Sequence, residues 1–133
     1  MTRYLLDTQA TVYLLTGDKK LPQNIREMVE YQTYPFYVSI VSIMEIAQLM
    51  TIGKIKTYPI ETIQSELIKY GITIVDMEIK QLESMRMLPI YSNHTDPFDR
   101  ILIVTAILYK MTLISSDTKL PLYRKSKLIL IEI

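Results

Sequence analysis

The sequence alternates between short, continuously apolar segments and longer segments with helical periodicity. The short segments are rich in β-branched and aromatic residues, which is typical of strands that are buried on both faces. The predicted strands are residues 4–6, 36–39, 72–75, 112–115 and 128–131. The predicted helices are residues 8–15, 21–31, 40–50, 60–70, 78–87 and 97–110. This alternation predicts an α/β fold with a mainly parallel central sheet.

The chain has 133 residues, which suits one domain over residues 1–133 with a core of its own. It contains no cysteine, so it has no disulfide and no thiolate metal site, and a reducing location is expected. The longest apolar run, residues 101–109, is about half the length that a membrane-spanning helix needs. Asp7 interrupts the first apolar segment before the core of a signal peptide could form. We therefore expect a cytoplasmic protein with no membrane partner.

Four carboxylates stand alone in segments that are otherwise uncharged and should be largely buried. Asp7 and Asp117 follow the first and fourth predicted strands. Glu45 lies in the helix after the second strand, and Asp99 lies in the first turn of the helix at 97–110. A buried carboxylate is costly unless something compensates its charge. Because the carboxyl ends of parallel strands share one edge of a sheet, we expect the four side chains to converge there.

Carboxylates gathered in one pocket repel each other unless a divalent cation lies among them. Oxygen ligands in a chain without cysteine indicate Mg²⁺ or Mn²⁺ rather than zinc. One or two such ions activate water and stabilise a phosphoryl transition state. The four carboxylates are therefore candidate metal ligands and candidate catalytic residues.

Each of these acids also has a simpler structural interpretation. Asp96 and Asp99 lie three residues apart at a helix start, where either could cap the helix or complement its dipole. Ser42 and Glu45 have the spacing of a capping box. The two acids at strand ends could belong to a turn or cap the next helix. The functional interpretation is favoured because all four isolated acids fall at positions consistent with one sheet edge.

Other residue types carry weaker signals. His94 is the only histidine, so no histidine-rich metal site is possible, and we expect a loop or hydrogen-bonding role for it. The tyrosines and methionines are expected to fill the core and interfaces, and the isolated glycines exclude a glycine-rich phosphate loop. Basic residues outnumber acids in the last third of the chain. Candidates for contact with an anionic backbone are Arg100, Lys119, Arg124 and Lys125, although the basic cluster could also be a solvated turn.

Four blocks of the sequence, in this order, resemble the PIN-domain family and, more narrowly, VapC-type toxins of bacterial and archaeal toxin–antitoxin pairs. The blocks read Leu5-Leu6-Asp7-Thr8, Val38-Ser39-Ile40-Val41-Ser42-Ile43-Met44-Glu45-Ile46, His94-Thr95-Asp96-Pro97-Phe98-Asp99-Arg100 and Leu113-Ile114-Ser115-Ser116-Asp117. They span nearly the whole chain, and the block that begins with histidine is the most specific.

The resemblance implies a three-layer α/β/α fold and a metal-dependent endoribonuclease that hydrolyses RNA phosphodiester bonds. The family's acidic quartet corresponds to Asp7, Glu45, Asp99 and Asp117. Two secondary positions also correspond, a hydroxyl residue before the last acid and an additional acid, here Ser115 and Asp96. The resemblance further implies a homodimer that a cognate antitoxin holds inactive.

The chain departs from the family pattern outside the quartet. Gln9 and Met44 stand where the subgroup often has a histidine and an aromatic residue, which affects packing and substrate choice more than chemistry. The alternative function is a non-catalytic module of the same fold that binds RNA or protein. A phosphatase is disfavoured because Gln9 replaces the second acid of an Asp-x-Asp motif, and a receiver domain because no acidic pair precedes the first strand.

Overall fold

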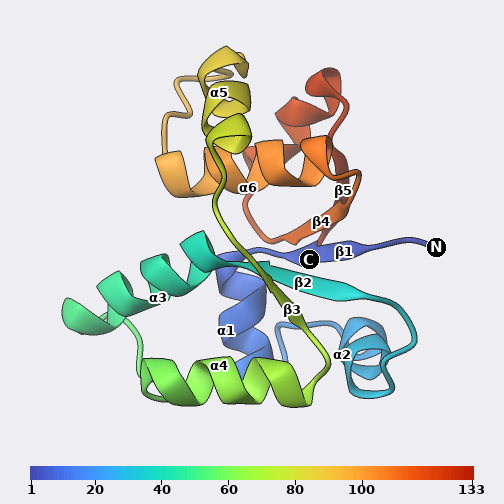
Figure 1. Ribbon diagram of the computed structural model, residues 1–133, viewed down its shortest axis with the longest axis vertical. Helices are drawn as coiled ribbons and strands as arrows, with labels where there is room; N and C mark the ends of the chain where they lie inside the picture. Colours follow the sequence, from blue (N-terminus) through green and yellow to red (C-terminus); the bar gives the residue numbers. More distant parts are fainter.

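The computed structural model describes residues 1–133 and contains a five-stranded sheet whose neighbouring strands are all parallel (Figure 1). In chain order the strands are β1 (Tyr4–Leu6), β2 (Phe36–Ser39), β3 (Thr73–Val75), β4 (Thr112–Ser115) and β5 (Ile129–Glu132). Their order across the sheet is β3-β2-β1-β4-β5. The predicted α/β class and parallel sheet are confirmed.

Six α-helices and one 3₁₀-helix connect the strands. They are α1 (Thr8–Thr16), α2 (Gln23–Glu30), α3 (Ile40–Thr51), α4 (Ile60–Lys69), α5 (Ile79–Met87), α6 (Pro97–Leu108) and the 3₁₀-helix η1 (Leu120–Ser126). The sequence prediction located all six α-helices and lacked η1. None of the helices combines the length and apolar character that crossing a membrane requires.

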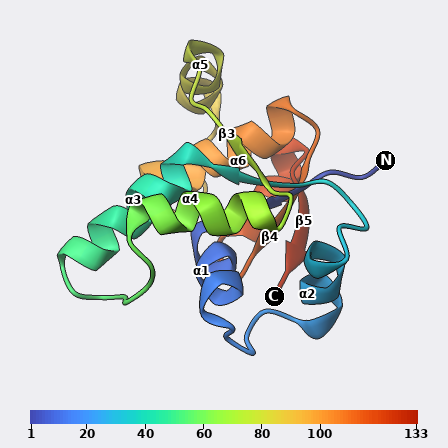
Figure 2. The same cartoon turned by 60° about the horizontal axis from the view of Figure 1, so that its bottom comes forward.

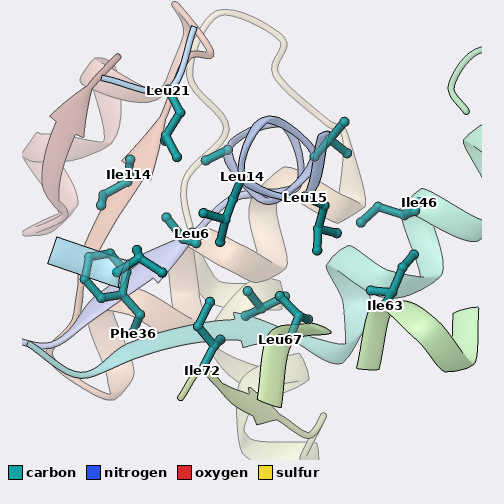
Figure 3. Packing of buried hydrophobic residues seen from close by; sticks show 14 of the residues in the cluster. Leu6, Leu14, Leu15, Leu21, Phe36, Ile46, Ile63, Leu67, Ile72 and Ile114 are labelled. Carbon is teal, nitrogen blue, oxygen red and sulfur yellow. The ribbon is translucent and has the colours of Figure 1, made fainter. Parts of the chain in front are cut away.

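Helices cover both faces of the sheet, with α1 and α2 on the opposite side from α5 (Figure 1, Figure 2). Successive residues of one strand point to different faces, so Leu6 packs into one core and Leu5 into the other. Figure 3 shows the first core, where Leu14 of α1 and Leu67 of α4 gather around Leu6. The second core packs α6 and η1 against the sheet. Burial on both faces explains why the strands are continuously apolar.

The carboxyl ends of β1 and β4 lie side by side at the centre of one sheet edge. Leu6 pairs with Ile114, and the Asp7 N–H donates a hydrogen bond to the Ile114 carbonyl at 3.0 Å. Asp7 therefore lies next to Ser115, and Asp117 follows two residues later on the same edge. The parallel arrangement thus brings the two strand-end acids to one place, as the sequence predicted.

Helix α3 follows β2 without an intervening loop and begins at Ile40, as predicted. Ser39 is the N-cap, and its hydroxyl accepts a hydrogen bond from the Val41 N–H at 3.0 Å. The alternative interpretation of Ser42 and Glu45 as a capping box is therefore excluded, because the N-cap lies three residues before Ser42. The Ser42 hydroxyl is instead buried inside the helix packing without a hydrogen-bond partner.

Candidate active site

Asp7 combines a structural role with a place in the candidate site. Its side chain is buried, and Oδ1 accepts a hydrogen bond from the Ala10 N–H at 2.7 Å, which caps α1. Burial raises the pKa of Asp7, and the negative charge of Glu45 acts in the same direction. A hydrogen bond from the Ser115 hydroxyl opposes this rise in pKa. Ser115 also accepts the Asp117 N–H at 3.0 Å, so one buried hydroxyl orients both strand-end acids.

Glu45 lies on α3 and is half-buried. Its Oε1 accepts a hydrogen bond from the Thr8 hydroxyl at 2.5 Å, which ties α3 to the first residue of α1. Burial raises the pKa of Glu45, and the charge of Asp96 adds to that rise, whereas the bond from Thr8 lowers it. The carboxyl group is therefore held in place by a neutral donor that leaves its charge uncompensated.

Asp99 and Asp117 approach each other beside His94. The His94 Nε2 atom lies 3.1 Å from Asp99 Oδ2 and 3.9 Å from Asp117 Oδ2. One ligand atom from each of the three residues lies within 4.8 Å of the others. Burial, a hydrogen bond shared with Asp117 and the nearby negative charges of Asp96, Asp117 and Glu45 together raise the pKa of Asp99 to about 8. Crowded like charges produce such a rise, and a cation among them would relieve it.

The structure separates Asp96 from the four isolated acids. Asp96 is exposed and is the N-cap of α6, where its Oδ1 accepts the N–H groups of Phe98 at 2.9 Å and Asp99 at 3.4 Å. The contacts of Asp96 are therefore those of a helix cap, while its negative charge still raises the pKa values of Glu45 and Asp99. Asp117 also forms a local turn, because its Oδ1 accepts the Lys119 N–H at 2.9 Å.

The prediction that Arg100 contacts RNA is wrong. Arg100 is buried, and its guanidinium group donates to the carbonyls of Met85 at 3.0 Å, Leu88 at 2.8 Å and Pro89 at 3.1 Å. These carbonyls lie at and beyond the end of α5, where no further turn of helix supplies N–H donors. The guanidinium group of Arg100 therefore binds backbone carbonyls inside the molecule and is not presented at the surface.

The other three predicted cations lie at the surface. Arg124 is held against β5, because it donates to the Leu130 carbonyl at 3.0 Å and pairs with Glu132 at 3.2 Å. Lys119 and Lys125 are exposed and form no ion pair. Lys119 follows the site acid Asp117 by two residues. Among the four predicted contacts with an anionic backbone, these two lysines are therefore the exposed ones whose charge has no acidic partner.

The sequence predicted a loop or hydrogen-bonding role for His94 and did not place it in the site. In the structure this residue is 4% exposed, and its Nε2 atom contacts the carboxyl group of Asp99. The available signal was its position five residues before Asp99 in the most specific sequence block. Its partner Tyr123, whose hydroxyl lies 2.8 Å from His94 Nδ1, is one of ten tyrosines and had no distinguishing signal.

The fold and site together define a class of protein: a three-layer α/β/α domain with clustered carboxylates at the carboxyl edge of a parallel sheet. The sequence model of the PIN domain matches residues 4–127. The chain therefore belongs to the PIN-domain family, and the resemblance at family level is confirmed. None of the curated protein sequences compared with the chain matches it.

Solved structures of similar fold include two toxin–antitoxin complexes bound to DNA. The chain is similar to VapBC2 from Rickettsia felis bound to a promoter DNA fragment, with 20% identity, a TM-score of 0.67 and 99% of each chain covered. It is also similar to DNA-bound VapBC from Salmonella typhimurium, with 16% identity, a TM-score of 0.68 and coverage of 99% of this chain and 98% of that chain. At these identities the likeness concerns the fold.

Proposed function

We propose that this protein is a metal-dependent endoribonuclease and the toxin of a toxin–antitoxin pair. The observation that carries the proposal is a group of crowded carboxylates: ligand atoms of Asp99 and Asp117 lie within 4.8 Å of each other, and the pKa values of Asp7, Glu45 and Asp99 are raised. Membership of the PIN-domain family supports nuclease chemistry. Raised carboxyl pKa values in a cleft are typical of functional sites.

The residues present fit a hard divalent cation. Among all described residues, no lysine or arginine forms an ion pair with any of the four carboxylates. Their negative charge is therefore uncompensated by the protein, and oxygen ligands favour Mg²⁺ or Mn²⁺. Asp99 and Asp117 would hold the ion, with Asp7 and Glu45 as further ligands directly or through water. When bound, the ion supplies charge stabilisation for a phosphoryl transition state and increases the acidity of water.

The side chains around this position have separate tasks in the proposed reaction. Glu45, whose pKa is raised by burial, is a stronger base than an ordinary carboxylate and is suited to accept a proton from the attacking water. Thr8 and Ser115 hold Glu45 and Asp7 in orientation through their hydroxyl groups. Lys119 and Lys125 bind the phosphate backbone of the RNA.

We also propose two protein partners, a cognate antitoxin that covers the site and a second copy of the chain, in the cytoplasm. An exposed apolar groove of about 160 Å³ supports protein partners. It is lined by Val41, Met44, Met77, Leu82, Met85, Pro97, Phe98 and Ile101. Met44 precedes Glu45, and Phe98 precedes Asp99, so a protein seated in the groove would lie beside the site. Met44 and Leu82 are the exposed apolar side chains that such a partner would cover.

The decisive experiment sequences RNA 5′ ends after expression of the wild-type chain and of Asp7→Asn. We expect new, discrete ends that require wild-type protein, and cleavage by purified protein that requires Mn²⁺ or Mg²⁺. Undiminished metal-dependent cleavage by Asp7→Asn would overturn the assignment. If the wild-type protein cleaves no RNA and binds no Mn²⁺ in calorimetry, the alternative of a non-catalytic binding module is favoured.

A further inference from the structure

A chain of buried polar side chains lies behind the carboxylates. It begins at Arg100 on α6, whose Nη1 lies 3.4 Å from the Tyr123 hydroxyl on η1. The Tyr123 hydroxyl lies 2.8 Å from His94 Nδ1, and His94 Nε2 lies 3.1 Å from Asp99 Oδ2. All three residues before Asp99 are buried, and Tyr123 is fully so. These hydrogen bonds therefore connect an arginine to a candidate metal ligand through two buried groups, His94 and Tyr123.

The chemistry of each group gives this chain a direction. A guanidinium group has only donors, so the Tyr123 hydroxyl accepts from Arg100. The single hydroxyl proton of Tyr123 then has two acceptors, His94 Nδ1 at 2.8 Å and the His94 carbonyl at 3.4 Å. Because the carboxylate oxygens of Asp99 and Asp117 that face Nε2 are acceptors, Nε2 carries the imidazole proton, and Nδ1 is left to accept the proton of Tyr123. A neutral imidazole whose Nδ1 accepts a hydrogen bond carries its own proton on Nε2.

From this direction we infer that His94 is a positioning residue: Tyr123 holds it in the Nε2–H tautomer, and its Nε2–H donates to the carboxylate of Asp99. The second carboxylate oxygen of Asp99 then stays free to face a cation. Hydrogen bonds of this kind orient metal ligands, and their loss commonly costs about 10- to 100-fold in metal affinity. The inference deepens the proposed function, because it assigns the support of one of the proposed ligands.

The opposite tautomer predicts a different role for His94. With the proton on Nδ1, the bare Nε2 lone pair would face carboxylate oxygens of Asp99 at 3.1 Å and Asp117 at 3.9 Å. That arrangement is repulsive unless a cation or the carboxyl proton of Asp99 lies between the groups, and with a cation there His94 would be a direct metal ligand. The two ionised carboxylates that face Nε2 oppose this alternative, and the two tautomers are distinguishable without any metal.

The surroundings hold this chain of residues in place. The other donors of Arg100 are occupied by three carbonyls after α5, so its guanidinium group has little freedom to move. The Tyr123 ring packs edge-on against Tyr91 at 4.9 Å and against His94 at 5.5 Å between ring centroids. A rigid donor and a packed ring keep the imidazole in one orientation, which is what a support for a metal ligand requires.

The direct test is a long-range ¹H–¹⁵N NMR spectrum of uniformly ¹⁵N-labelled, metal-free protein without a histidine tag. His94 is the only histidine, so the spectrum contains a single imidazole system and needs no assignment. In buffer above the pKa of Asp99, which is about 8, so that its carboxyl group is ionised, we expect a protonated Nε2 and an unprotonated Nδ1. A protonated Nδ1, a doubly protonated ring or averaged shifts from exchanging tautomers would each overturn the inference.

Variants test the support of the metal ligand. Tyr123→Phe removes the proton donated to Nδ1 and keeps the ring, so we expect averaged tautomer shifts and a roughly tenfold weaker Mn²⁺ affinity in calorimetry. His94→Gln keeps an N–H near the position of Nε2 and should retain Mn²⁺ affinity within a few-fold, whereas His94→Leu should lose about 10- to 100-fold.

Tyr91→Phe is the matched control for Tyr123→Phe. Tyr91 packs against the same ring, but its hydroxyl pairs with Ser126 at 2.9 Å and not with the chain of residues from Arg100 to Asp99. Tyr91→Phe should therefore keep the wild-type tautomer and Mn²⁺ affinity. Equal effects of the two variants would overturn the inference. RNA cleavage is not a readout here, so absent ribonuclease activity would defeat the proposed function and leave the tautomer result unaffected.

Discussion

Helices α1 and α6 both begin after an aspartate that caps them, but the roles of helix cap and candidate metal ligand are distributed differently in the two. In α1, one residue does both, because Asp7 accepts the Ala10 N–H and also lies among the candidate metal ligands. In α6, the tasks are divided between Asp96, which is an exposed cap, and Asp99, which lies among the carboxylates.

The difference arises from where each helix starts. Only Asp7 separates β1 from α1, so the one acid at the strand end must also cap the helix. Helix α6 follows a loop, so its cap lies outside the cluster and its first turn carries Asp99 inward. In α6, mutations of Asp96 and Asp99 should therefore change stability and catalysis separately. In α1, only an isosteric change of Asp7 should separate the two.

The largest expected effect is that of Asp99→Asn on RNA cleavage. Removing the charge of a proposed ligand should lower the single-turnover rate with Mn²⁺ by at least about a hundredfold. The fold should persist, because the cap of α6 belongs to Asp96. Circular dichroism controls for folding, and cleavage within about threefold of wild type would contradict the assignment of Asp99.

Two changes at Asp7 should separate the roles that this residue combines. Both Asp7→Asn and Asp7→Ala should lose cleavage by a similar factor, since each removes the negative charge. Only Asp7→Ala removes the helix cap, which should lower the free energy of unfolding by about 1 kcal/mol relative to Asp7→Asn. Urea unfolding of the metal-free variants measures this difference, and equal midpoints would show that the cap at α1 contributes nothing.

The metal-free protein should become less stable as the pH rises. The pKa of Asp99 is raised from 3.8 to about 8, so the folded state holds this proton more tightly than the unfolded state. That stabilisation is complete below 3.8 and is lost as the pH passes through about 8.

Urea unfolding across this range should show the decline, and Mn²⁺ should offset it at the alkaline end. Asp99→Asn, which cannot titrate at this position, should flatten the pH dependence. A stability that rises with pH in metal-free wild-type protein would contradict the crowding of uncompensated carboxylates.

The smallest expected effect concerns the separate cap of α6. Asp96→Ala should lower the free energy of unfolding by about 1 kcal/mol, and Asp96→Asn should preserve it, because asparagine also caps helices. Cleavage should fall far less than in Asp99→Asn. A loss of cleavage by Asp96→Ala as large as that of Asp99→Asn would make Asp96 part of the site and remove the contrast between the two helices.

Much of the fold was predictable because both sheet faces are buried. The central strands β1, β2 and β4 are largely buried and had to be mostly apolar, and the prediction located all five strands with ends that differ by at most one residue. Helix η1 was missed because a short 3₁₀ segment that contains Pro121 has no extended periodicity to detect. The start of α3 at Ile40 was predicted correctly, and it excludes the alternative capping box because Ser42 lies inside the helix.

The candidate site was predictable where charge conflicted with an apolar setting. Asp7, Glu45, Asp99 and Asp117 stood out because a lone carboxylate in an apolar segment needs an explanation. Arg100 was wrongly predicted to contact RNA at the surface. Its partners are backbone carbonyls, which leave no recognisable pattern of side chains in the sequence. His94 and Tyr123 are polar residues of common types, and nothing in their local sequence indicates that their side chains meet.

The sequence by itself determined the parallel α/β architecture and the edge at which the acids gather, because period and burial along the chain dictate both. Only the tertiary structure decided which neutral groups support those acids. The contacts of Thr8 with Glu45, Ser115 with Asp7, and His94 with Asp99 join segments that are brought together by packing. Hydrogen-bond direction depends on atoms within about 3 Å of one another, a proximity that the order of residues does not encode locally.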